Sequence, residues 1–117
     1  MEYEVFSAWL DETLAQELPE DIVAFNFNLY EDDDNTWSVE LVGTGSFDPT
    51  SEDWAGDEVF TNRENPLCWT AEKGWEDVLE DVISQIRTYL SQGQYRDILR
   101  STIALGVGFV DGDIVLL

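Results

Sequence analysis

The residues that could carry chemistry in this sequence are almost all carboxylates. The chain holds 26 Asp and Glu, one Cys and no His. Without histidine, Ser-His and Cys-His nucleophile pairs and the commonest zinc ligand are excluded. A glycosidase-type pair of carboxyls remains, and it needs one carboxyl in an apolar pocket with a raised pKa. Glu40 and Asp48 could form such a pair, but so many carboxylates make accidental pairs common, and we predict no catalytic residue and no enzyme.

The spacing of the candidate ligand residues does not match that of known metal or phosphate sites. The run Asp32–Asn35 resembles the start of a calcium loop, but that loop would require Gly at position 37 and Glu at position 43. The sequence has Trp37 and Gly43 there, so we interpret the run as a hairpin tip. Cys68 lies between apolar neighbours, which predicts a buried structural thiol. No glycine-rich segment carries the lysine of a phosphate loop, and we predict no metal and no cofactor.

The charge is distributed unevenly along the chain. The first 62 residues contain seventeen Asp and Glu and no Lys or Arg, and the formal net charge is −21. All five basic residues come later: Arg63, Lys73, Arg87, Arg96 and Arg100. Such a field repels nucleic acid and anionic membrane and favours a basic protein as partner. Adaptation to high salt is the alternative explanation, since the chain has a single Lys, but it would spread the acidity more evenly.

The first elements that position these side chains are a helix and a hairpin. Apolar residues at helical spacing predict a helix over 4–18, which Pro19 ends. Alternation predicts a strand over 22–30 and a second strand with Trp37, Val39 and Leu41 facing the core. In this pattern Ser38 and Glu40 face water. Residues 31–35 form the polar link between the two strands.

The second half predicts helices followed by a hairpin. Segment 47–69 reads as a long loop with one short strand near 58–61. An apolar stripe that includes Trp75 predicts a helix over 71–92, capped by Thr70 and Gly93, and a shorter helix follows over 94–102. Asp111-Gly112 between apolar runs indicates a closing hairpin with a type I′ turn.

These elements predict an α+β fold. The sheet is mainly antiparallel, and the N-terminal helix and the long central amphipathic helix pack on one of its faces. We expect one domain over 1–117. The first residues lack the pattern of a signal peptide and no apolar run is long enough to span a membrane, so we expect a cytoplasmic protein.

Two acidic segments are the candidate contact surface. In the second of them Trp54 stands among carboxylates, as an aromatic that contacts a cationic partner would, although it could equally pin the loop to the domain. The predicted partner-binding residues are Glu31, Asp32, Asp33, Asp34, Asp48, Glu52, Asp53, Trp54, Asp57 and Glu58.

The acidic format, the helix from Trp75-Glu76 to Gly93 and the closing Gly108–Asp113 hairpin carry a family resemblance. In these features the chain resembles the small acidic α+β immunity proteins of bacterial polymorphic and contact-dependent toxin systems. The resemblance implies a non-catalytic toxin inhibitor that sequesters a cognate basic toxin, such as a nuclease. The alternatives are a DNA mimic that blocks DNA-binding proteins, a small carboxylate-based enzyme, and an acidic housekeeping domain.

Overall fold

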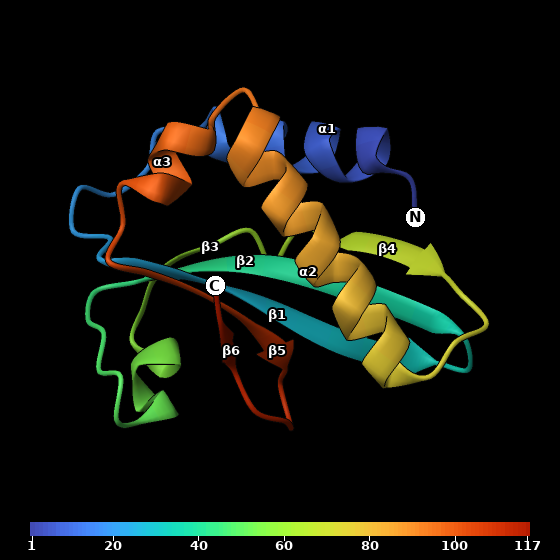
Figure 1. The fold of residues 1–117 in the computed structure, drawn as a ribbon. Coiled ribbons are helices and arrows are strands. Elements are labelled where there is room, and N and C mark those ends of the chain that lie inside the picture. Colours follow the sequence, from blue (N-terminus) through green and yellow to red (C-terminus); the bar gives the residue numbers. More distant parts are fainter.

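Three helices cover one face of a six-stranded sheet in the computed structural model, which describes residues 1–117 (Figure 1). The helices are α1 (Tyr3–Leu14), α2 (Trp75–Gln92) and α3 (Arg96–Arg100), and a short 3₁₀ helix, η1 (Glu52–Gly56), lies on the other face. The strands are β1 (Ala24–Asp33), β2 (Thr36–Thr44), β3 (Glu58–Thr61), β4 (Leu67–Thr70), β5 (Ala104–Phe109) and β6 (Val115–Leu116). The predicted α+β class and the mainly antiparallel sheet are confirmed.

The sheet is built around one long hairpin, with strand order β3-β2-β1-β5-β6. Strands β3 and β4 pair with the two ends of the same edge of β2. The β1–β2 hairpin runs from Ala24 opposite Thr44 to Asp33 opposite Thr36. Strand β5 lies parallel to β1 on its other side, a pairing that the sequence pattern did not indicate.

The core lies between the helices and the sheet. Phe25, Phe27 and Leu29 of β1 point toward the helices, as the alternation predicted, and pack with buried residues of α1 and α2. The buried stripe of α1 is Phe6, Trp9, Leu10, Thr13 and Leu14, and that of α2 is Val78, Val82, Ile86 and Tyr89. No helix is both long enough and apolar enough to cross a membrane.

The three helix predictions are right in place and need correction at their ends, and α3 is shorter than the predicted 94–102. Helix α1 stops at Leu14, four residues before the predicted end, and α2 begins at Trp75 after Gly74 rather than after Thr70. Gly93 does follow α2, but its φ is −69°. Glycine is needed there for space, since a Cβ would lie 2.5 Å from the Tyr89 ring.

The connections between strands differ more from the sequence pattern. Glu31 to Asp33 belong to β1, and the turn itself is tight, with Asn35 at a φ of 60°. The closing hairpin exists, but no glycine has a positive φ, so its turn is not type I′. The short strand predicted near 58–61 is present as β3, whereas β4 and η1 lie in what was predicted to be loop.

Candidate functional site

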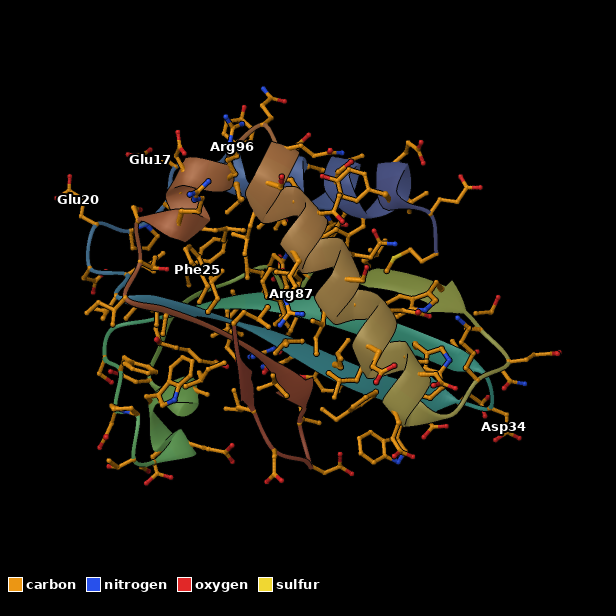
Figure 2. All side chains as sticks on the ribbon, viewed as in Figure 1. Glu17, Glu20, Phe25, Asp34, Arg87 and Arg96 are labelled. Atoms are coloured by element: carbon orange, nitrogen blue, oxygen red, sulfur yellow. The ribbon has the colours of Figure 1, made fainter.

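The two predicted acidic segments lie at opposite ends of the β1–β2 hairpin. Residues 31–34 surround its turn, whereas residues 48–58 follow Thr44 and return to it, because Glu58 of β3 pairs with Thr44. Figure 2 shows Asp34 at one end of the sheet and Glu17 and Glu20 beyond the other. At about 3.3 Å per residue, the hairpin separates the two segments by roughly 30 Å. They are therefore two surfaces rather than one.

The hairpin tip, residues Glu31–Asp34, is an exposed acidic surface. The Asp33 carboxylate accepts a hydrogen bond from the Asp34 backbone N–H at 2.8 Å, which holds the turn. None of the three salt bridges of the protein involves these four carboxylates. No basic side chain neutralises them, so they remain free to attract a cationic partner.

The second segment, residues 48–58, uses some of its carboxylates for structure. Asp48 accepts hydrogen bonds from the backbone N–H and the hydroxyl of Thr50, and these bonds lower its pKa. Glu52 accepts a hydrogen bond from the backbone N–H of Ile114 at 2.7 Å, which ties η1 to the closing hairpin. Asp53 and Asp57 are exposed and form no salt bridge, so they are the residues of this segment best placed for a partner.

Trp54 is not available at the surface. Its side chain is 5% exposed and lies edge-on to Phe47, with ring centroids 5.0 Å apart. Its indole also packs over Gly106, where a Cβ would lie 3.2 Å from it. Trp54 therefore anchors η1 to the open face of the sheet, and we remove it from the candidate contact residues.

Glu40 is the centre of a polar network that the sequence pattern missed. Alternation placed this carboxylate in water, but Glu40 is 2% exposed. Arg63 donates to both of its oxygens, from Nε at 2.9 Å and from Nη2 at 3.1 Å. The Asn28 amide and the Tyr30 hydroxyl donate to Oε1 at 3.0 Å and 2.8 Å. Arg63 also pairs with Glu58, which extends the network to the surface.

This network stabilises a charged Glu40. Burial alone would raise the pKa of Glu40, but the hydrogen bonds from Arg63, Asn28 and Tyr30 hold it below its usual value. Burial and the neighbouring Glu40 raise the pKa of Tyr30 to about 12. A general acid needs a raised pKa, and the pKa values of Glu40 and Asp48 are both lowered. The arrangement therefore suits a structural anion better than an acid catalyst.

The basic residues offer little compensation near the hairpin tip. Lys73 pairs with Asp81, and Arg63 pairs with Glu40 and Glu58. Arg96 and Arg100 donate to the backbone carbonyls of Gly93 and Leu90 near the C-terminal end of α2. Arg87 forms no salt bridge, but it lies in α2 twelve positions after Trp75, more than three helical turns farther along the helix. The field around the hairpin tip therefore stays negative.

The remaining candidate side chains form no recognisable centre. No three His, Cys, Asp or Glu side chains are placed to share a metal ion. Cys68 is exposed on β4, so the prediction of a buried thiol is wrong. Position 68 lies opposite Ser38 on the open face of the sheet, where no helix covers it. Comparison with family models, curated proteins and solved structures gives no match.

Proposed function

We propose that this chain is a non-catalytic acidic protein that sequesters a basic protein partner. More specifically, we propose an immunity protein that acts in the cytoplasm and neutralises a cognate bacterial toxin, such as a nuclease. Nucleases carry basic clefts for nucleic acid, and a protein with a formal charge of −21 is opposite in sign to such a cleft and is attracted to it.

One observation carries the proposal: exposed carboxylates without counter-charges stand at both ends of the β1–β2 hairpin. They are Glu31–Asp34 at the tip and Asp53 and Asp57 at the other end. Such a field accelerates encounter with a basic protein, to about 10⁸–10⁹ M⁻¹s⁻¹ at low salt. The lowered pKa values of Glu40 and Asp48 support a non-catalytic role, because neither carboxyl is held in the protonated form that an acid catalyst requires.

The test uses the product of the adjacent reading frame as the binding partner. Association and dissociation rates are measured by surface plasmon resonance over a range of salt concentrations. The wild type is compared with Asp33→Lys, Asp53→Lys and Asp57→Lys. The control variants, Glu17→Lys and Glu20→Lys, make the same change in charge outside both acidic segments (Figure 2).

We expect each variant of the acidic segments to lower the association rate severalfold at low salt, more than the control variants do, and to flatten its salt dependence. The control variants should slow association slightly and leave dissociation unchanged. Unchanged affinity and salt dependence in all three test variants would contradict the proposal. Competition between this chain and duplex DNA for several unrelated DNA-binding proteins would favour DNA mimicry instead.

A further inference from the structure

An apolar groove opens beside the acidic hairpin tip. It has a volume of about 810 Å³ and lies between the end of β1, the first two turns of α2 and the β5–β6 connection. Its apolar lining is Leu29, Trp75, Leu79, Phe109, Val110 and Val115. We call it the acid-rimmed groove. Figure 1 shows the N-terminal end of α2 descending toward this end of the sheet.

Trp75 makes the groove unusual. The stripe of α2 predicted that this side chain faces the core, but it is 54% exposed, which corrects that expectation. Its ring lies edge-on to Phe109 at 6.1 Å, and Phe109 lies edge-on to the buried Trp37 at 5.9 Å. Val110 is also more than half exposed. An aromatic row thus runs from the core to open solvent, where a partner could cover it.

The charges around the groove specify what would cover it. Its charged lining residues are Glu31, Asp111 and Asp113, all acidic, and the rest of the hairpin tip continues directly from Glu31. The nearby Lys73 is paired with Asp81. A second copy of this chain would bring the same negative charge to the groove and be repelled. A basic segment would be attracted, and an apolar side chain within it would fill the groove.

We infer that the acid-rimmed groove docks a segment of the basic partner in which lysines or arginines flank one aliphatic or aromatic side chain. The inference rests on the proposed function and adds an anchor to it. Charge steers the partner to the tip, and burial of Trp75 and Val110 slows its departure. It also predicts a contact surface that the acidic segments alone do not contain.

Two synthetic peptides test this on the full chain. One carries several lysines around a central Leu-Phe pair, and its twin has the same lysines around Ser-Asn. Binding is followed by tryptophan fluorescence, because Trp75 is exposed whereas Trp9, Trp37 and Trp54 are buried and Trp69 is partly buried. It is followed by ¹⁵N chemical shifts when Trp75 is replaced. The variants are Trp75→Ser, Val110→Ser, and Asp111→Asn with Asp113→Asn. Two further variants are the controls. Ile103→Ser removes an apolar side chain that is 72% exposed at the opposite end of β5. Glu20→Gln removes one negative charge outside both acidic segments.

We expect the Leu-Phe peptide to bind wild type about tenfold more tightly than its twin. Trp75→Ser and Val110→Ser should each reduce that preference, and Ile103→Ser should not. The Asp111 and Asp113 changes should weaken both peptides about equally, and Glu20→Gln should weaken them less. Equal binding of the two peptides, or indifference to Trp75→Ser and Val110→Ser, overturns the groove inference while the proposed function stands. If neither peptide binds at low salt, both are overturned.

Discussion

Replacing Glu40 by glutamine tests whether the buried network holds the open face of the sheet together. The Glu40 carboxylate accepts four hydrogen bonds from Arg63, Asn28 and Tyr30, at 2.8 to 3.1 Å. Glutamine keeps the shape but has one oxygen, and its amide nitrogen would face donors. At least one buried donor then loses its acceptor, and the charge that made these bonds strong is gone.

The cost follows from the burial of each partner. A hydrogen bond to a charged group contributes about 1.5–3 kcal/mol, and leaving a buried partner unpaired adds to its loss. The Arg63 side chain is 53% exposed, however, so water replaces part of what it loses. We therefore expect Glu40→Gln to lower the free energy of unfolding by about 2–3 kcal/mol at neutral pH, or the melting temperature by about 10 °C.

The pH dependence provides an independent check. The pKa of Glu40 in the folded state lies below its ordinary value of 4.5. A lowered folded pKa means that this contribution is fully present above about pH 4.5 and is lost as the pH falls through the folded value. Glutamine does not titrate. The difference in free energy of unfolding between wild type and Glu40→Gln should therefore narrow as the pH falls below about 4.5.

Urea unfolding followed by circular dichroism at several pH values measures both effects. The matched control is Glu58→Gln, because Glu58 accepts from the same Arg63 but lies nearer the surface, and we expect it to cost under about 1 kcal/mol. A Glu40→Gln variant within about 0.5 kcal/mol of wild type at neutral pH, or a gap that stays constant with pH, would refute this account.

Three further predictions concern single contacts. Tyr89→Phe should cost about 1–2 kcal/mol in urea unfolding, because the buried Tyr89 hydroxyl donates to the Asp11 carboxylate at 2.6 Å; an unchanged midpoint would contradict this bond. Gly106→Ala should lower the melting temperature by several degrees, since its Cβ would lie 2.5 Å from the Asn26 amide oxygen, whereas Gly56→Ala, with nothing within 4 Å, should change it little. Cys68 should react with a thiol reagent in the native protein without denaturant, and protection until unfolding would show that it is buried.

Hydrophobic periodicity predicted the elements that pack against the helices. Phe25, Phe27 and Leu29 alternate with Asn26 and Asn28 and point toward the helices, although Asn26 on the opposite face is also buried. The same holds for the stripes of α1 and α2, which meet this face. Within these segments the pattern in the chain and the burial in the structure agree, apart from Asn26, the ends of the helices and the first turn of α2.

The pattern fails where a second layer covers the sheet. Glu40 and Ser38 look solvent-facing in a strand with one apolar face, yet β2 is buried on both faces after its first residue. Arg63 and η1 cover that open face, and both come from the segment in which alternation is absent. The burial of Glu40 depends on its ion pair with Arg63, which lies 23 positions later in the chain. Residue spacing does not reveal a contact of that kind.

The sequence predicted the acidic turn of the candidate surface but not the groove beside it. An acidic turn is visible as a run of carboxylates, so the exposure of Glu31–Asp34 follows from local sequence. The acid-rimmed groove joins that turn to Trp75 and to Val110, which are far apart in the chain. Their meeting depends on β5 lying beside β1, a long-range parallel pairing that leaves no periodic signal in either strand.

The place of β5 in the sheet also sets the order in which the protein can fold. β1 and β2 are joined by a tight turn, so their hairpin can close early. The pairing of β1 with β5 joins residues far apart in the chain, such as Ala24 and Ala104, which are 80 positions apart. Because the entropic cost of closing a loop grows with the logarithm of its length, an 80-residue loop contributes roughly 4 kcal/mol to the free energy opposing this pairing. Until it forms, the inner edge of β1 has no strand beside it. A chain still emerging from the ribosome therefore exposes the central strand of its sheet to mispairing until Ala104–Phe109 have been made.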